Sequence, residues 1–515
     1  MKFIASYRFI ALVIFLISSM LTIYITSPYG FIFFTFIMLA AFSSLFPIVM
    51  SRKILAKVVF STIIFLIIYG FYLQYIVSLE LWGDEIGVIQ IAGNSFLAIR
   101  DKVSTLHATV PPLDYWILHV WKVLVAVSPD KYHEFIYRIP YIIMHGVAAI
   151  VFALLVEKSC VGNTSKISTM LLFFLAFITY IFHPLLFPYS IEVRFYAMAA
   201  LGSVIALSLF MQNRFFSLRY YPLLLIFCLN SIFQFIILLP YIVYGLLYTT
   251  IHRRSAIILS VSLLVLFVLI YPLLHIYPGI GYKASSKGIL DALSHFRFLQ
   301  FNSNLQLVAA GCMLLFEFLR NKNRFSLWGL LSILGFYITS VVVLAYTTQY
   351  FAFHVRHLVF TMPLVLYFLF LPLMKTQGTI QYIFMILFAV FFTIPWVQKT
   401  NTMITTHDLF SKILMGSKKL AQVSKKNSLD VIITPNTGPP ALGDEKIHYI
   451  DSVKWYLRTY TSAKIVHAKS QNDVCHIVKT DKHFIVYSIN DKIDCLSRDF
   501  QIQYIEGSIV YLPSL

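Results

Sequence analysis

The most constraining feature of this sequence is a series of apolar runs that are each long enough to cross a lipid bilayer. A helix needs about 20 residues to span roughly 30 Å of hydrocarbon, and one aqueous core cannot bury so many segments of that kind. Hydrophobic residues make up 59% of the 515 residues, and charged residues only 12%. We therefore expect an all-α, polytopic membrane domain. The runs lie at Phe9–Ile25, Phe31–Met50, Val58–Val77, Ile139–Val156, Ile167–Phe187, Phe195–Met211, Ala256–Ile276, Leu305–Leu319, Ser326–Tyr346, Leu358–Met374 and Ile380–Trp396.

A further stretch, Tyr221–Ile251, is long for one span and short for two. Asn230, Ser231 and Gln234 interrupt its middle, so we expect a tight hairpin of two short helices, which makes about 13 spans in all. With the amino terminus in the cytoplasm, Lys and Arg gather in the cytoplasmic loops, as the positive-inside rule requires. The first large outer loop, Leu79 to Arg138, has five basic residues against seven acidic ones. This asymmetry supports the predicted orientation.

The composition changes after Trp396, where polar and apolar residues begin to alternate in short runs that are typical of strands. We predict a membrane domain over residues 1–396 and a small α/β domain over residues 397–515. The helix count places the second domain outside the cytoplasm. Cys475 and Cys495 both fall in it, and an oxidising compartment would permit a disulfide between them.

The net charge of +18 would suggest a nucleic-acid partner in a soluble protein. Here the basic residues lie between apolar runs, so topology signals and contacts with lipid headgroups explain them better. We expect no nucleic acid as a partner. None of the five cysteines forms a C-x-x-C pair, which leaves a zinc or redox motif with little support.

Two groups of ionisable residues lie in the first outer loop, and such groups at membrane depth usually face a cavity or a partner. Asp84 and Glu85 follow the third span. Adjacent carboxylates can bind a cation or act as a general base, but the dipeptide alone favours solvated charges that cap the helix. Asp114 and Tyr115 follow two prolines that start an amphipathic segment. That segment is either the wall of a site or only a scaffold lying along the membrane surface.

Two more groups lie at the outer ends of later spans. Glu192 and Arg194, followed by Tyr196, can line a polar cavity or simply neutralise each other. Arg356 and His357 begin another span. A guanidinium can hold a phosphate through two parallel hydrogen bonds, but it can also anchor a helix at the interface. Taken alone, the group at Arg356 favours the anchoring interpretation, whereas the group at Glu192 leaves both interpretations open.

The order of these groups resembles that of the bacterial GT-C glycosyltransferases, the relatives of protein O-mannosyltransferases and of the lipid A aminoarabinose transferase. The matching segments are Asp84-Glu85, Pro111-Pro112-Leu113-Asp114-Tyr115-Trp116-Ile-Leu-His119, Tyr137-Arg138-Ile-Pro140, Tyr189-Ser-Ile-Glu192-Val-Arg194-Phe-Tyr196-Ala and Arg356-His357-Leu-Val-Phe-Thr-Met-Pro363. Each motif is weak, and the five in order are a stronger signal. The sequence departs from the family pattern at Val110, where the family has His, and at Asp114 and His357, where it has Tyr. These departures leave the substrate open.

The resemblance implies an enzyme that takes a sugar from a polyprenyl-phosphate lipid at the outer face of the membrane. It would transfer that sugar, with inversion, to a lipid, glycan or protein acceptor. Asp84 would be the base, with Glu85 beside it, and Arg194, Arg356 and His357 would meet the donor phosphate. The cavity or acceptor site would be lined by Asp114, Tyr115, Glu192, Tyr196 and Arg138.

The same resemblance places the chain in a bacterial inner membrane as a multi-pass protein. No feature of the sequence requires a cofactor. Asp84, Glu85 and Glu192 could bind a divalent cation, but nothing in the pattern demands one.

Two other classes of protein are compatible with the many spans. A transporter or flippase for lipid-linked glycans often shows repeats and broken helices near the midplane, and we find no clear repeat. A polysaccharide polymerase or ligase keeps a large outer loop late in the chain, whereas the marked loop here is early. The discriminating arrangement is a pair of interfacial helices in that early loop, with Asp84 facing Arg194 and Arg356 across a cavity.

Overall fold

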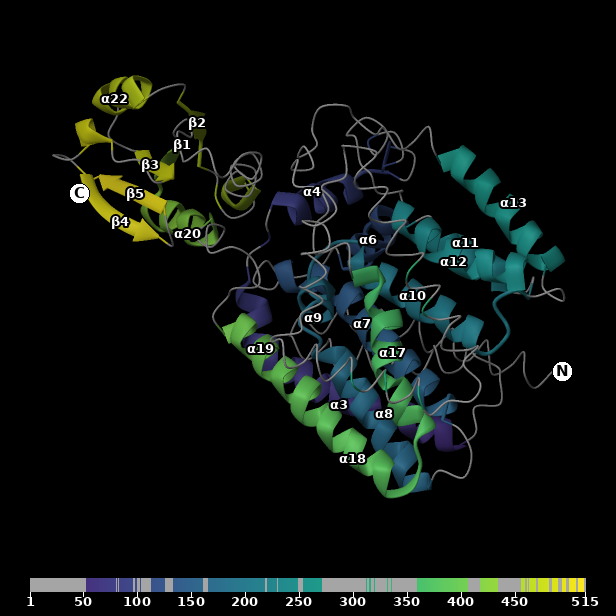
Figure 1. Ribbon diagram of the computed structural model, residues 1–515. Coiled ribbons are helices and arrows are strands. Elements are labelled where there is room, and N and C mark those ends of the chain that lie inside the picture. The colour runs from purple at the N-terminus through teal and green to yellow at the C-terminus, as the bar shows by residue number, and fades with distance from the viewer. Residues whose placement is uncertain are drawn as a thin grey trace. The chain divides into compact units, whose positions relative to one another are not determined.

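Among the residues that the computed structural model describes, the elements are helices up to residue 405 and a mixture of helices and strands from residue 417 onward (Figure 1). Contacts divide the chain into two units, Met1–Phe71 with Ile91–Asn401 and Tyr72–Gln90 with Thr402–Leu515. The structure describes residues 52–79, 81, 83–95, 98–99, 102, 113–125, 133–160, 165–217, 220–228, 230–248, 253–270, 312, 315, 319, 331, 335, 359–405, 417–433, 455–458, 461, 463–468, 471–480, 484–489, 493–496, 500–505 and 508–513.

The described helices up to residue 405 are mostly apolar. In chain order they are α3 (Arg52–Ser78), α4 (Gly83–Ala92), α6 (Leu113–Leu124), α7 (His133–Lys158), α8 (Lys166–Ile181), α9 (Leu186–Ser190), α10 (Tyr196–Met211), α11 (Tyr221–Cys228), α12 (Ile232–Tyr248), α13 (Arg253–Ile270), α17 (Met362–Lys375), α18 (Gly378–Phe388), the π-turn η5 (Ala389–Thr393) and α19 (Ile394–Thr405). Among the described residues, three stretches are long and apolar enough to cross a membrane: Ile54–Val77, Glu134–Lys158 and Gly378–Ile404.

Helix α7 organises the packing of the first unit. It packs most extensively against α8 and α10, and it also contacts α6, α9 and α17. Ala148, Ala149 and Ala153 on α7 are fully buried, and such small side chains let helices approach closely. Gly146 serves the contact with α3, because a β-carbon there would lie 2.8 Å from Cζ of Phe65. Small residues on α7 therefore set how near its neighbours come.

Large apolar side chains are exposed along one face of α3. Ile63, Ile67 and Phe71 recur every four residues and are exposed by 39%, 66% and 73%. A spacing of four residues puts them on a single face of the helix. The continuous helix from α18 to α19 carries a similar stripe at Ile383, Ile386, Val390 and Ile394. Apolar faces of this extent suit lipid rather than water, as expected for an integral membrane protein.

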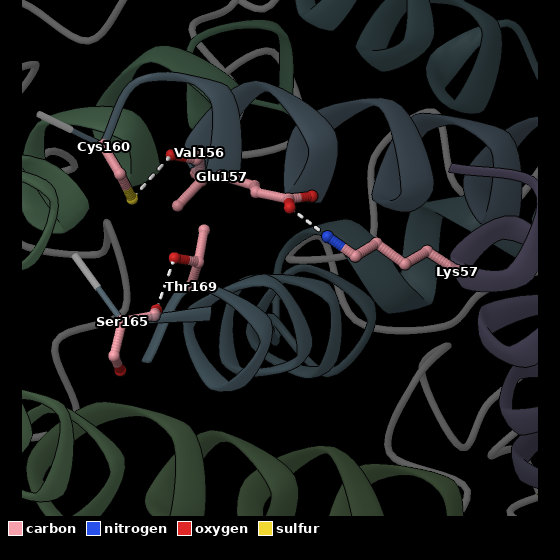
Figure 2. Close-up of polar contacts among 6 residues, drawn as sticks. All are labelled: Lys57, Val156, Glu157, Cys160, Ser165 and Thr169. Carbon is pink, nitrogen blue, oxygen red and sulfur yellow. Dashed lines mark hydrogen bonds and ion pairs between the residues drawn. The ribbon is translucent and has the colours of Figure 1, made fainter. Parts of the chain in front are cut away.

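Polar contacts lie near both ends of α7. At its carboxyl end, Lys57 of α3 forms an ion pair with Glu157, and the Cys160 thiol donates to the carbonyl of Val156 at 3.6 Å (Figure 2). At the other end, Arg138 is fully buried. Nineteen residues separate Arg138 from Glu157, which corresponds to roughly 28 Å of helix. That length is close to the thickness of the bilayer hydrocarbon, so each polar layer lies near one membrane surface.

Three predicted spans differ from the observed helices. The run Ile167–Phe187 is interrupted, because α8 ends at Ile181 and Pro184 lies in the break before α9. The run Ile380–Trp396 continues to Thr405, so the predicted domain boundary at residue 396 falls inside a helix. The stretch Tyr221–Ile251 is broken after Cys228 as predicted, but α11 has only eight residues and is too short to span a bilayer.

The second unit contains a five-stranded sheet among its described residues, with strand order β2-β1-β3-β5-β4. Strand β1 pairs in parallel with β2 and β3, whereas β5 pairs antiparallel with β3 and β4. β1 is a short apolar run buried over its last three residues, as expected of a central parallel strand. The elements of this region are α20 (Ser417–Asn427), β1 (Asp430–Ile433), β2 (Ile465–His467), α22 (Gln471–Thr480), β3 (Phe484–Ile489), the 3₁₀ turn η8 (Asp494–Leu496), β4 (Phe500–Ile505) and β5 (Ser508–Pro513).

A disulfide joins Cys475 of α22 to Cys495 of η8, which confirms the predicted pairing. Cys475 packs against the apolar core between α22 and the sheet. The buried members of that core are Ile432, Ala468, Val474, Val478, Phe484, Val486, Ile493, Leu496 and Tyr511. The disulfide therefore ties the loop after β3 to the helix that covers the sheet.

The second unit also includes the segment Tyr72–Gln90, which the sequence did not predict. Within that unit the backbone N–H of Leu81 donates to the hydroxyl of Tyr456 at 2.7 Å, and both residues are buried. The segment contains the end of α3 and most of α4, and α4 carries Asp84 and Glu85. The candidate carboxylates are thus held together with the carboxy-terminal part of the chain.

Candidate active site

A group of buried ionisable side chains lies at the starts of α6 and α7 and in the turn before α10. Asp114, Glu134, Arg138 and Glu192 are each at most 1% exposed, although they belong to residue types that proteins seldom bury. Burying a charge is costly unless it is paired or hydrogen-bonded. This concentration at one end of the helices marks the candidate site.

Helix α6 owes its orientation to its amphipathic sequence. Asp114, Tyr115, Leu118 and Trp121 are buried, and their spacing of three and four residues defines one face. The indole N–H of Trp121 donates to the carbonyl of Ile136 on α7 at 2.8 Å. These contacts hold the face that carries Asp114 and Tyr115 toward α7.

The end of α4 is fastened to the same helix. Nδ1 of His119 lies 2.9 Å from the carbonyl oxygen of Ala92, and both residues belong to the first unit. His119 was matched to a family motif without an assigned role. Its observed contact is a structural one between two helices of the early loop.

The turn between α9 and α10 presents Glu192 and Arg194. The backbone N–H of Arg194 donates to the carbonyl of Glu192 at 2.8 Å, which closes a tight bend. The hydroxyls of Ser190 and Tyr69 are 3.0 Å apart, so the turn is also attached to α3. The guanidinium of Arg194 lies over the ring of Tyr196, 5.4 Å from its centre, at a distance suited to a cation–π contact.

Glu192 and Arg194 form an ion pair with an N–O distance of 3.9 Å. The Glu192 side chain is 1% exposed, whereas that of Arg194 keeps 15% of its surface. The ion pair agrees with the interpretation in which the two charges neutralise each other. A polar cavity at these residues stays a prediction.

Asp114 is buried in the first turn of α6. Burial raises its pKa to about 7, while the nearby hydroxyl of Tyr141 and the positive charge of Arg194 act in the opposite direction. The positive charge of Arg194 is therefore one of the influences on the Asp114 carboxyl.

Two polar residues that the sequence marked only as interruptions support the start of α10. The side-chain amide of Asn230 donates to the carbonyl of Phe195 at 3.1 Å, and that of Gln234 donates to the carbonyl of Ala199 at 2.6 Å. Both are buried. The break between α11 and α12 therefore serves to hold the turn that carries Arg194.

The start of α17 packs beside this turn. The ring of Phe360 stacks on Phe195, with ring centres 6.1 Å apart, and on Phe233 at 5.0 Å. A small cavity between α10, α12 and α17 is lined by Ser203, Ile237, Pro240, Tyr241, Phe360, Thr361 and Leu364. Arg356 and His357 lie outside the described residues, so their predicted part in phosphate binding stays a prediction.

The predicted catalytic carboxylates belong to the second unit. Glu85 is fully buried on α4, and the side chain of Asp84 lies outside the described residues. The arrangement of Asp84 opposite Arg194 and Arg356 thus stays a prediction. In the part of the chain that the structure describes, no three His, Cys, Asp or Glu side chains come together as a metal site.

Comparison with known proteins gives a fold but no sequence family. No protein-family model and no curated protein sequence matches the chain. The structure of ArnT from Cupriavidus metallidurans bound to undecaprenyl phosphate aligns with a TM-score of 0.50 and 10% identity, over 88% of this chain and 97% of that chain. The apo state of the same ArnT aligns with a TM-score of 0.48 and 9% identity, over 87% of this chain and 97% of the ArnT chain. An oligosaccharyltransferase from Archaeoglobus fulgidus, tethered with an acceptor peptide, aligns with a TM-score of 0.37 and 9% identity. That alignment covers 79% of this chain and 66% of the oligosaccharyltransferase chain.

At sequence identities of about 10%, the likeness shows a similar fold and nothing more. The alignment with the lipid-bound ArnT, at a TM-score of 0.50, is the basis for this conclusion. ArnT is the lipid A aminoarabinose transferase, a GT-C glycosyltransferase. The expected resemblance to this superfamily is therefore confirmed at the level of the fold.

Proposed function

We propose that this protein is a membrane glycosyltransferase that moves a sugar from a polyprenyl-phosphate lipid to an acceptor outside the cytoplasm, with inversion. The observation that carries the proposal is the buried cluster around Arg194 at one end of an ArnT-like helical fold. Such a cluster is costly to bury, and an anionic substrate gives a reason for it. A bacterial inner membrane is the location we propose.

Arg194 is the proposed phosphate ligand within the described residues. Its guanidinium is partly exposed, and its ion pair with Glu192 is long at 3.9 Å, so an incoming phosphate can compete for it. Arg356 and His357 are proposed to complete the positive surroundings. As the sugar leaves, charge develops on the phosphate oxygen, and fixed positive groups stabilise that charge.

Asp84 is the proposed base, with Glu85 beside it. The acceptor hydroxyl or amine attacks the anomeric carbon and gives its proton to the Asp84 carboxylate. The bond between that carbon and the phosphate oxygen breaks, and the electron pair leaves with the lipid phosphate. The proposed cavity and acceptor residues are Asp114, Tyr115, Glu192, Tyr196 and Arg138.

A single-turnover assay with the purified full-length protein tests the proposal. A radiolabelled polyprenyl-phosphate sugar is mixed with the protein in detergent, and the label is followed from the lipid to an acceptor. The acceptor is found first, by mass spectrometry of glycolipids, lipopolysaccharide and glycoproteins from cells with and without the protein. We expect transfer within one turnover. Absence of transfer from every such donor tried would count against an enzyme.

A transporter or flippase for lipid-linked glycans is the second candidate. The helix breaks between α8 and α9 and between α11 and α12 favour it, because broken helices are common in transporters. Purified protein of that class would make no glycosylated product, although it would move lipid across vesicle membranes. The two assays therefore separate the candidates.

A further inference from the structure

The positive charge of the carboxy-terminal part of the chain is concentrated in one helix, α20. Four of the eleven residues of α20 are lysines, and none is acidic. The rest of the segment Thr402–Leu515 is nearly balanced, with ten basic and eleven acidic residues. The excess positive charge of this segment therefore comes from α20 alone.

Helix geometry places these lysines on one face of α20, which we call the lysine face. At 3.6 residues per turn they lie within an arc of about 120° around the helix axis. The opposite face carries Leu420, Ala421 and Ser424, which are all buried. Lys425 and Lys426 are exposed. The residues of the lysine face are Lys418, Lys419, Lys425 and Lys426.

The stability of the helix explains only half of the lysine face. Lys425 and Lys426 lie in the last turn, where the helix dipole favours a cation. Lys418 and Lys419 lie at the start of the helix, where the same dipole disfavours a cation. A negatively charged partner accounts for both pairs.

The unit that contains α20 is attached to the membrane. The apolar stretches Ile54–Val77 and Gly378–Ile404 are each long enough to cross a bilayer, and both end within this unit. Helix α20 starts twelve residues after α19 ends. An extended chain of that length reaches at most about 40 Å. The nearest extended negative surface available to the lysine face is therefore the layer of lipid headgroups.

We propose that the lysine face of α20 binds the anionic phospholipid headgroups of the membrane that the chain itself spans. Each lysine close to such a surface strengthens the attraction by roughly fivefold. The attachment to membrane helices makes the contact intramolecular, so a modest attraction is enough to hold it. The same unit includes Asp84 and Glu85, which the contact would keep near the headgroups. The inference does not depend on whether a sugar is transferred.

Photo-crosslinking of the full-length protein in nanodiscs tests the contact. A benzophenone amino acid replaces Gln422, which is exposed and lies at the middle of the lysine face. The nanodiscs contain phosphatidylglycerol and phosphatidylcholine in equal amounts. After irradiation, mass spectrometry of the peptide that contains position 422 identifies the attached lipid.

We expect attachment of the anionic lipid at least about fivefold more often than of the zwitterionic lipid. In 1 M NaCl this preference should fall toward equality, because the Debye length shortens to about 3 Å. The salt dependence is measured on protein that keeps all its lysines, so it does not rely on the folding of a lysine variant.

Two matched variants assign the preference to the lysine face. Glutamine has a helix propensity close to that of lysine, so the first variant should keep α20 helical while removing its charge. We expect that variant to attach both lipids equally. The second removes the same charge elsewhere in the carboxy-terminal segment and should keep the preference. The first is Lys418→Gln, Lys419→Gln, Lys425→Gln, Lys426→Gln, and the second is Lys464→Gln, Lys469→Gln, Lys479→Gln, Lys482→Gln.

Three results would overturn the inference. They are absence of any lipid adduct at position 422, equal attachment of the two lipids, and a preference that survives removal of the four lysines of α20. An adduct with protein in place of lipid would also overturn it, and would identify the partner of the lysine face as a polypeptide.

Discussion

Asp84 and Arg194 have different tasks in the proposed reaction, and single substitutions can separate those tasks. The base is needed only when the acceptor loses its proton. The guanidinium meets the phosphate both in the bound donor and in the transition state. An interaction present only in the transition state affects the rate, whereas one present in both states affects donor binding as well.

Asp84→Asn should reduce single-turnover transfer by at least 100-fold and leave donor affinity within a few-fold of the wild type. Asn keeps the shape of the carboxylate but cannot take a proton at neutral pH. Arg356→Ala serves as the contrasting variant and should weaken donor binding together with the rate. Wild-type turnover by Asp84→Asn would show that another group is the base.

At this scale the sequence indicates candidate residues, whereas their contacts depend on tertiary structure. Glu192 and Arg194 are two residues apart, and mutual neutralisation was one of two interpretations that the sequence left open; the observed ion pair agrees with it. Asn230 and Gln234 were identified only as polar interruptions, because their hydrogen bonds reach carbonyls 35 residues away on α10. The raised pKa of Asp114 depends on burial between α6 and α7, which no local pattern records.

At the scale of helices and strands, close packing depends on a few small residues. Gly146→Ala should destabilise the protein by about 1 to 3 kcal/mol, because the new β-carbon meets the ring of Phe65 on α3. Gly70→Ala on α3 is the matched control, since nothing lies within 4 Å of its β-carbon position. It should be neutral or stabilise by up to about 1 kcal/mol. Thermal unfolding of both variants in detergent makes the comparison, and equal midpoints would contradict the role of Gly146.

The disulfide between Cys475 and Cys495 should stabilise the sheet of the second unit. It closes a loop with a sequence separation of 20 residues, and a loop of this size is worth about 3 kcal/mol in the unfolded-chain model. The double variant Cys475→Ser, Cys495→Ser should therefore show faster hydrogen exchange in β3 and α22. Cys160→Ser removes a free thiol and serves as the control. Unchanged exchange in the double variant would mean that the apolar core alone holds the sheet.

The sequence predicted the end of a helix correctly where a cluster of polar residues interrupts an apolar run. The interruption after Cys228 followed from a cluster of polar residues, and it was found there. The break after Ile181 was missed, because Pro184 stands in an otherwise apolar run and the hydropathy signal continues across it. The extension of the last apolar helix to Thr405 was missed because its final turns are polar. The hydropathy signal ends at Trp396, whereas the helix continues.

For the whole molecule, orientation in the membrane remains a prediction from the distribution of Lys and Arg. Reporter fusions after Lys322 and after Leu515 should report opposite sides, with the first in the cytoplasm. A fusion after Cys160, between α7 and α8, should agree with the first. Cytoplasmic signals from both Lys322 and Leu515 would mean that the number of spans is even and that the carboxy-terminal region is inside.

The fold class could be predicted from apolar runs and from five short motifs in order, because both are properties of the sequence read from end to end. The composition of the second unit could not. Its two segments, Tyr72–Gln90 and Thr402–Leu515, are far apart in the chain, and only tertiary contacts such as the one between Leu81 and Tyr456 unite them.

This division has a consequence for biosynthesis. The ribosome makes Tyr72–Gln90 early and must add roughly 300 further residues before the partner segment begins to emerge. At about 5 to 20 residues per second, that interval lasts on the order of 15 to 60 s. During this time Asp84 and Glu85 have been synthesised but lack the chain segment that completes their unit. Assembly of the second unit is therefore a late event, which can follow only after the last apolar helix has left the ribosome.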